Sequence, residues 1–148
     1  MKQSEDLGVA LDFLRLLWAI DHGLQRRSKR MESEIGVTGL QRVVIRLVGR
    51  FPGATAGRLA SLVHVHPSTL TGVLKRIVER GLVARERDEN DARVARFTLT
   101  AEGARIDRSR AGTVEAVVRR AIGKLDPRDL DGARTALAAV AAELARVD

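Results

Sequence analysis

The segment from Thr55 to Thr100 most constrains the fold, because its apolar pattern changes from helical to strand-like within a short distance. Thr55 is a favourable N-terminal cap for a short helix with apolar residues at Leu59, Leu62 and Val63. His64-Val65-His66 interrupts this helix, and Pro67 suits the first turn of a second one, where its missing N–H costs nothing. The segment therefore begins as two short helices joined by a tight break, and we expect His66 to cap the second helix.

The second helix combines an apolar stripe with a face that suits double-stranded DNA. The stripe consists of Leu70, Val73, Leu74 and Ile77, and Gly81 stands where a left-handed C-terminal cap is expected. The opposite face carries hydroxyl groups, a glycine and two cations, at Ser68, Thr69, Thr71, Gly72, Lys75 and Arg76. Such a helix fits the major groove, where these side chains reach phosphates and base edges. An ordinary amphipathic surface helix has the same pattern.

Two strand-like runs, 82–87 and 93–99, follow this helix and enclose the turn-forming residues Asp88-Glu89-Asn90-Asp91. Helix, break, helix and hairpin in this order predict a winged helix-turn-helix. In the hairpin we expect Arg87, Asp91 and Arg93 to contact DNA. Arg93 suits a narrow minor groove, and Asp91 is placed to hold its guanidinium in one pose. A charged tip that only discourages aggregation is the alternative.

The distribution of charge supports the DNA interpretation. Residues 42–110 contain 14 basic and 7 acidic side chains, whereas 1–41 and 111–148 each contain 6 of either sign. The whole net charge of +7 therefore lies in the middle segment. A basic centre between neutral ends is typical of a nucleic-acid-binding module, although a solvated Arg-rich face gives the same totals.

Helical patterns flank the centre and indicate a mainly α protein with a small β-wing. Ser4 can cap a long helix that reaches about Arg30. Thr38 and Gln41 form the capping-box pattern of another helix, which Phe51-Pro52-Gly53 ends. We divide the chain into an N-terminal dimerisation helix (1–37), a winged helix-turn-helix lobe (38–100) and C-terminal dimerisation helices (101–148).

Two helices are expected in the C-terminal part. Thr100 caps one that continues to Leu125, with apolar residues on one side at Ile106, Val114, Val117, Ala121 and Leu125. Asp126 and Pro127 begin the last helix, where Leu130, Ala133, Leu137, Val140 and Leu144 repeat as a heptad seam. Such stripes on terminal helices favour packing against another chain.

Several functional classes find no support. Without Cys there is no thiolate metal site and no thiol redox switch. His64 and His66 have no evident third ligand, so we expect no metal and no cofactor. No nucleophile–base pair, paired carboxylates or Gly-rich phosphate loop indicates an enzyme. No apolar run is long enough to span a bilayer, and we expect a cytoplasmic protein.

Residues 38–103 resemble the multiple-antibiotic-resistance regulator (MarR) family of winged-helix transcription factors. The resemblance rests on Leu59-Ala60, Ser68-Thr69-Leu70-Thr71, Arg80-Gly81-Leu82-Val83, Arg85, Asp88, Asp91-Ala92-Arg93 and Leu99-Thr100-Ala101-Glu102-Gly103. It implies a homodimer that reads a pseudo-palindromic operator in double-stranded DNA, with the recognition helices in major grooves and Arg93 in a minor groove.

The resemblance also implies a repressor that a small aromatic or phenolic effector releases from DNA. Trp18 and His22, one turn apart on the first helix, could line the effector pocket, or they could belong to the dimer interface. The alternative function is a winged-helix protein-protein interaction module, an anti-repressor or scaffold, without sequence-specific DNA binding.

Overall fold

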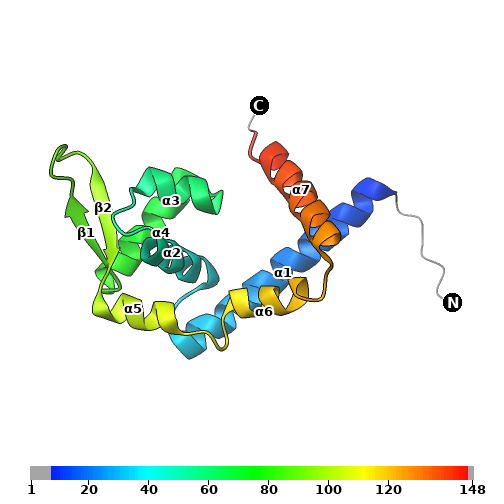
Figure 1. The fold of residues 1–148 in the computed structure, drawn as a ribbon, viewed down its shortest axis with the longest axis horizontal. Helices are drawn as coiled ribbons and strands as arrows, with labels where there is room; N and C mark the ends of the chain where they lie inside the picture. Colours follow the sequence, from blue (N-terminus) through cyan, green and yellow to red (C-terminus); the bar gives the residue numbers. More distant parts are fainter. Residues whose placement is uncertain (1–7, 147–148) are drawn as a thin grey trace.

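The computed structural model describes residues 8–146, and this part of the chain forms two arms (Figure 1). One arm is a lobe built from α2 (Gly39–Arg50), α3 (Ala56–Val63), α4 (Pro67–Glu79), β1 (Val83–Arg87), β2 (Ala95–Leu99) and α5 (Ala101–Arg108). The other arm consists of α1 (Val9–Ile35), α6 (Val114–Ile122) and α7 (Pro127–Leu144). The mainly helical fold with a small wing is the predicted one.

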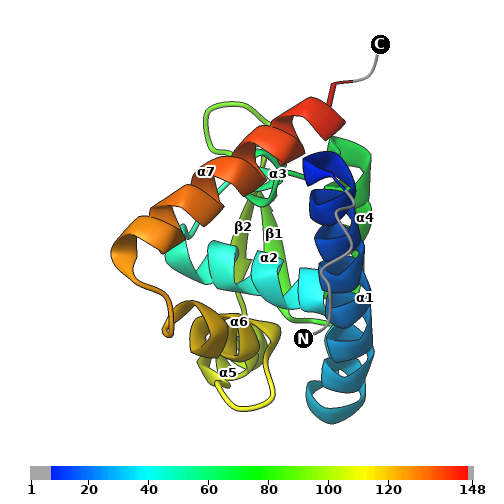
Figure 2. The same cartoon turned by 90° about the vertical axis from the view of Figure 1, so that its right-hand side faces the viewer.

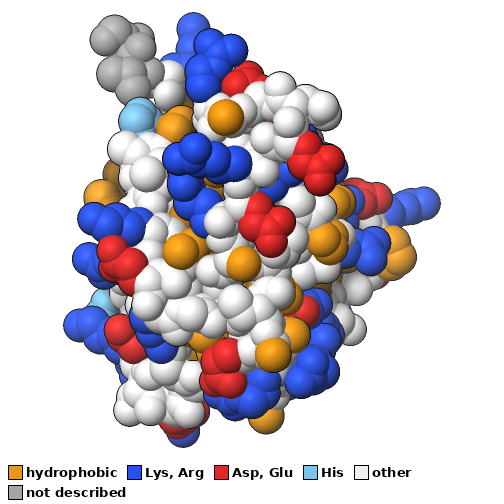
Figure 3. Space-filling model, turned by 90° about the vertical axis from the view of Figure 1, so that its left-hand side faces the viewer, with side chains coloured by type: hydrophobic (Ala, Val, Ile, Leu, Met, Phe, Trp, Pro, Cys, Tyr) orange, Lys and Arg blue, Asp and Glu red, His pale blue; other side chains and the backbone are white. Residues whose placement is uncertain are grey.

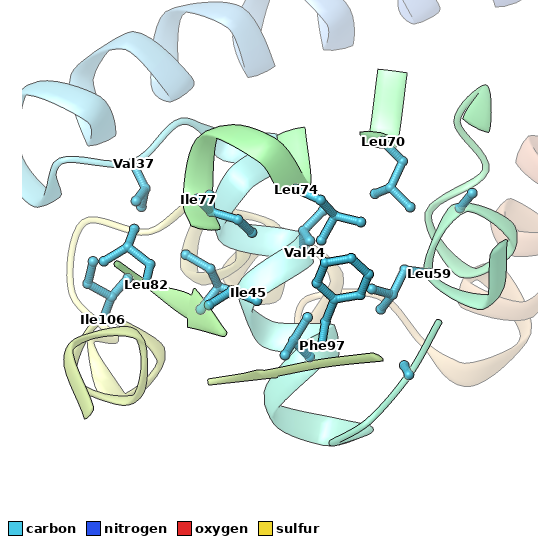
Figure 4. Packing of buried hydrophobic residues seen from close by; sticks show 14 residues of the cluster. Val37, Val44, Ile45, Leu59, Leu70, Leu74, Ile77, Leu82, Phe97 and Ile106 are labelled. Atoms are coloured by element: carbon cyan, nitrogen blue, oxygen red, sulfur yellow. The ribbon is translucent and has the colours of Figure 1, made fainter. Parts of the chain in front are cut away.

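Apolar side chains from every element of the lobe meet around α2. Val44, Ile45 and Val48 of α2 are fully buried, and Phe97 of β2 lies among Val44, Leu59 and Leu74 (Figure 4). Four apolar side chains anchor α3 and α4 to this core, at Leu59, Leu70, Leu74 and Ile77. Burial of each such side chain stabilises the lobe by about 1.5–3 kcal/mol.

The predicted caps of the lobe are confirmed. The Thr38 side chain accepts a hydrogen bond from the Gln41 N–H, and the Gln41 side chain accepts one from the Thr38 N–H, which completes the capping box. Thr55 caps α3, and His66 caps α4 with Pro67 in the first turn. Gly81 follows α4 with φ of 71°, in the left-handed region that favours glycine.

The first helix ends later than the sequence predicted. It continues past Arg30 to Ile35. The Met31 side chain is fully buried, and Arg30 forms an ion pair with Glu34 one turn further on (Nε–Oε1 2.8 Å), so both residues stabilise this last part of the helix. Gly36, with φ of 89°, then ends it. The predicted cap at Ser4 lies outside the described residues, and the described helix begins after Gly8.

The single helix predicted from Thr100 to Leu125 is wrong, because the chain forms α5 and α6 with a loop between them. Gly112 has φ of 75° in that loop, and the Thr113 side chain accepts a hydrogen bond from the Ala116 N–H to begin α6. The apolar residues before and after the loop therefore belong to different helices, and Ile106 packs in the lobe core.

Arg42 of α2 stabilises this break. Its fully buried guanidinium donates to the carbonyl oxygens of Ile106, Asp107 and Ser109 at the end of α5. It also pairs with Glu115 in the first turn of α6, with Nε and Nη2 at 2.8 and 2.7 Å from Oε1. One side chain thus satisfies helix-terminal carbonyls of α5 and fixes α6 to the lobe.

The second arm exposes much apolar surface. Viewed from that side, α7 runs at an angle to α1, while α6 contacts α1 (Figure 2). No residue of α7 is buried, and α1 exposes Leu11, Leu16 and Ile20. No helix in the described part of the chain is long and apolar enough to cross a membrane.

Candidate nucleic-acid interface

The reading face predicted on α4 is exposed. Leu70, Leu74 and Ile77 face the core, whereas the six predicted contact residues face outward, namely Ser68, Thr69, Thr71, Gly72, Lys75 and Arg76. Lys75 makes only a long contact with Glu79 (Nζ–Oε1 4.0 Å). A helix with one anchored side and one side of short polar groups and cations has the shape that a major groove accepts.

The first turn of α4 has hydrogen bonds of its own. His66 Nδ1 accepts from the Ser68 N–H (3.1 Å) and lies 2.7 Å from Ser68 Oγ, while Thr71 Oγ1 donates to the Pro67 carbonyl (2.9 Å). The hydroxyls of Ser68 and Thr71 are thereby held in defined positions. His64 in the preceding turn has φ of 58°, which makes the break between α3 and α4 tight.

The wing is a regular antiparallel hairpin in which Val83 pairs with Leu99 and Arg87 with Ala95. At the tip, Asp91 holds the Arg93 guanidinium, as the two-residue spacing predicted. Asp91 Oδ1 accepts from the Arg93 N–H (3.0 Å) and Nε (3.1 Å), and Oδ2 accepts from Nη2 (3.3 Å). The hydrogen bond from the Arg93 side chain, with that from its backbone N–H, lowers the pKa of Asp91. The Arg93 side chain remains 91% exposed and therefore free to enter a groove.

A second ion pair, which the sequence did not indicate, supports the base of the tip. Asp88 accepts from the Arg96 side chain and from the backbone N–H groups of Asn90 and Asp91 (3.1 Å each). The hydrogen bond from Arg96 is the main cause of the lowered pKa of Asp88. Arg96 Nη1 also donates to the Gly53 carbonyl (2.9 Å), which ties the wing to the connection between α2 and α3.

Arg87 is the last residue of β1 and is exposed, and its contact with DNA remains a prediction. Viewed from the wing end, cationic side chains are spread over the surface with carboxylates between them (Figure 3). The cations on this face therefore do not form one continuous basic patch.

Trp18 and His22, the residues predicted for an effector pocket, do not lie in a described cavity with the DNA-binding lobe. Trp18 is 65% exposed on α1, and His22 is exposed one turn further on. A cavity of about 690 Å³ instead separates the α3–α4 turn, including His64 and His66, from the end of α7 near Leu144. Neither Trp18 nor His22 lines this cavity, and their role remains a prediction.

No group of three or more His, Cys, Asp or Glu side chains that could hold a metal occurs among residues 8–146. His66 is engaged with Ser68 at the start of α4.

The anchored helix, the preceding short helix and the ordered wing define a winged helix-turn-helix protein. The sequence model of the MarR family matches residues 37–95. An HTH-type transcriptional repressor of Mycobacterium tuberculosis is 32% identical over 106 residues, which cover 72% of this chain and 73% of the relative. The chain belongs to the MarR family, and its function is that of a DNA-binding transcriptional regulator.

One further curated relative is also a transcriptional regulator, and two solved structures share the fold of this chain. The organic hydroperoxide resistance transcriptional regulator of Bacillus subtilis is 28% identical over 89 residues, 60% of either chain. The S. aureus MepR–DNA complex has a TM-score of 0.75 at 16% identity and covers 89% of this chain and 97% of that one. PcaV of Streptomyces coelicolor, solved with its natural ligand, has a TM-score of 0.70 at 22% identity and covers 99% and 100%.

Proposed function

We propose that this protein is a homodimeric repressor that binds a pseudo-palindromic operator and that a small effector releases from DNA. The exposed reading face on α4, flanked by a wing that presents a braced Arg93, is the observation that carries the proposal. As a regulator of chromosomal DNA, the protein would act in the cytoplasm. Curated relatives named as transcriptional repressors support the sign of regulation.

The apolar surface of the second arm supports the dimer. Leu130, Leu137 and Val140 of α7 retain their heptad spacing but are not buried within one chain. Together with the exposed stripe of α1 they form a surface that a second copy with two-fold symmetry would cover. Such a pair would place two α4 helices on one side of the duplex, with half-sites about one helical turn apart.

The predicted contact residues take distinct roles in this proposal. The α4 residues Ser68, Thr69, Thr71, Gly72, Lys75 and Arg76 lie in the major groove. Arg87 contacts the backbone, and Arg93, held by Asp91, enters the minor groove.

Selection of bound fragments from the source genome would identify the operator. Fluorescence anisotropy at several salt concentrations would then compare the operator with random duplex of equal length. We expect a preference of roughly a thousandfold or more and a steep loss of affinity with salt. Equal binding of both duplexes would contradict sequence-specific recognition and would favour the alternative, a protein-protein interaction module.

The effector proposal has separate support and its own test. The family resemblance suggests an aromatic or phenolic anion, and the PcaV and MepR-like structures are described with a natural ligand and pseudoligands. This chain has no Cys, so a thiol-based response to peroxide is not open to it. Thermal-shift measurements with aromatic carboxylates should show a concentration-dependent rise in melting temperature, and the same compounds should release the operator. A stabilising compound that leaves DNA binding unchanged would not be an effector.

A further inference from the structure

A cavity of about 540 Å³ outside the predicted interface is lined by three arginines. Arg50 ends α2, Arg58 lies in the first turn of α3, and Arg96 belongs to β2, so three separate elements converge on it. The connection between α2 and α3 passes beside the wing at this point (Figure 1), and the Gly53 N–H donates to the Phe97 carbonyl (2.8 Å). The sequence pattern gave no sign of this arrangement, because the three residues belong to three different elements.

The charge of this site is largely uncompensated. Arg96 is neutralised by Asp88, but neither Arg50 nor Arg58 forms an ion pair with any carboxylate within residues 8–146. No acidic side chain lines the cavity. The Arg58 guanidinium lies over the Phe51 ring (4.8 Å to the centroid), which orients it without consuming its charge.

The same cavity contains the start of α3. The Thr55 hydroxyl accepts from the Arg58 N–H (3.3 Å), while the other N–H groups of the first turn have no partner within the helix. Backbone donors at a helix start and two guanidinium groups suit a phosphate oxygen.

The site is continuous with the DNA-facing side of the lobe. A groove of about 500 Å³ between α4 and the wing is lined by Thr71 and Lys75 of the reading face, by Arg85 and by Ala56, among others. Ala56 is the first residue of α3, directly after Thr55 of the arginine cavity. A duplex seated on α4 would therefore pass its backbone over the start of α3.

We propose that Arg50 and Arg58, with the N-terminus of α3 and Arg96, form a cradle for one DNA backbone phosphate outside the recognition helix and the wing tip. The cradle rests on the proposed operator binding and deepens it. It would contribute affinity and register but no sequence preference, because a phosphate carries no base identity. Each dimer would have two cradles, one in each half-site.

The test compares the wild-type protein with R50Q/R58Q and R50K/R58K on the operator and on random duplex at several salt concentrations. The Gln variant should bind both duplexes roughly tenfold more weakly, with the preference for the operator unchanged. Its slope of log K against log salt should fall by about 0.9 for each lost phosphate contact, or about 1.8 for the dimer. The Lys variant keeps both charges and should retain most of the slope.

The control variant R119Q/R120Q removes two exposed charges from α6, away from the cavity, and should leave the slope near the wild-type value. A slope for R50Q/R58Q that equals that of the control would overturn the cradle, provided that the wild type prefers its operator. A wild type without that preference would instead defeat the proposed function.

Inorganic phosphate, titrated at constant ionic strength, distinguishes DNA from a free anion. We expect no saturable rise in the melting temperature of the wild type. A saturable rise that R50Q/R58Q lacks, together with unchanged DNA binding, would overturn the assignment to DNA and identify a free-anion site.

Discussion

At the residue scale, the buried charge of Arg42 stabilises the break between α5 and α6. Its guanidinium has no exposure, and its three nitrogen atoms donate to the carbonyl oxygens of Ile106, Asp107 and Ser109 and to the carboxylate of Glu115. Burial is the largest single effect on Glu115 and raises its pKa. The hydrogen bond from Arg42, the backbone hydrogen bond of Glu115 and the charges of Arg42 and Arg46 together outweigh burial, so the pKa is lowered. A methionine of similar length at position 42 would leave several acceptors and a carboxylate without partners.

We expect R42M to lower the free energy of unfolding by about 3–5 kcal/mol, measured by urea denaturation. The double variant R42M/E115M also removes the unpaired carboxylate and should recover part of the lost unfolding free energy. Its stability can be measured even if R42M alone fails to fold. R105M, which breaks the exposed pair with Glu102, should change stability by about 0–1 kcal/mol. Equal effects of R42M and R105M would contradict the role of Arg42.

Gly103 is required by a close approach of α5 to the strand that begins the wing. A Cβ at this position would lie 1.8 Å from the Leu82 carbonyl oxygen, whereas one at Gly132 in α7 meets nothing within 4 Å. We expect G103A to lower the unfolding free energy by about 3 kcal/mol. G132A should raise it by up to about 1 kcal/mol, because alanine favours helix. Thermal denaturation of the pair measures both, and a neutral G103A would contradict the packing.

At the scale of elements, the wing is braced at both ends of its loop. Asp91 holds Arg93, and Asp88 holds Arg96, which in turn reaches Gly53 on the connection before α3. Local spacing was enough to predict the first pair, since its members are two residues apart. The second depends on hairpin register, which brings residue 96 back toward residue 88, and on a connection more than forty residues away.

Substitutions at the tip should separate contact from positioning. R93A should weaken operator binding by roughly 1–3 kcal/mol, because a minor-groove contact is lost. D91N keeps one acceptor oxygen but loses the negative charge of the carboxylate. Because Arg93 retains its positive charge, we expect D91N to lose less operator affinity than R93A. Anisotropy measurements on operators with altered flanking base pairs should show that R93A discriminates less at those positions. A D91N variant weaker than R93A would contradict a positioning role for Asp91.

The tip should also loosen in acid. The folded pKa of both Asp88 and Asp91 is lowered, so their ion pairs stabilise the wing above the unfolded pKa of about 3.9 and are lost as the pH falls through the lower folded values. NMR signals of the Arg93 and Arg96 Nε–H groups should stay constant between about pH 7 and 5 and broaden only below about 4. Broadening near neutral pH would contradict carboxylate bracing.

At the scale of the whole molecule, the lobe has a buried apolar core, whereas the second arm exposes much of its apolar surface. The lobe buries side chains from six elements around α2, whereas α7 buries none and Leu137 is 49% exposed. A free surface of this kind is costly in water unless another chain covers it.

We therefore expect L137E to convert a dimer into a monomer, measured by analytical ultracentrifugation, while the circular dichroism of the lobe is retained. The variant should also lose operator affinity, because two half-sites no longer act together. R134E introduces the same glutamate side chain beside the seam, with a larger change of charge, and should leave the dimer intact. A wild type that sediments as a monomer would contradict the proposal.

The sequence by itself determined the features that depend on residues no more than four positions apart. These are the caps at Thr38, Thr55 and His66, the left-handed Gly81, the alternation of β2 and the Asp91–Arg93 pair. It also determined the class of the fold, because the order of these local patterns is distinctive. Tertiary structure decided the break between α5 and α6, the Arg42 network, the tie from Arg96 to Gly53 and the grouping of Arg50 with Arg58. Each of these joins residues that only the packing of the core around α2 brings together, and no spacing along the chain encodes that proximity.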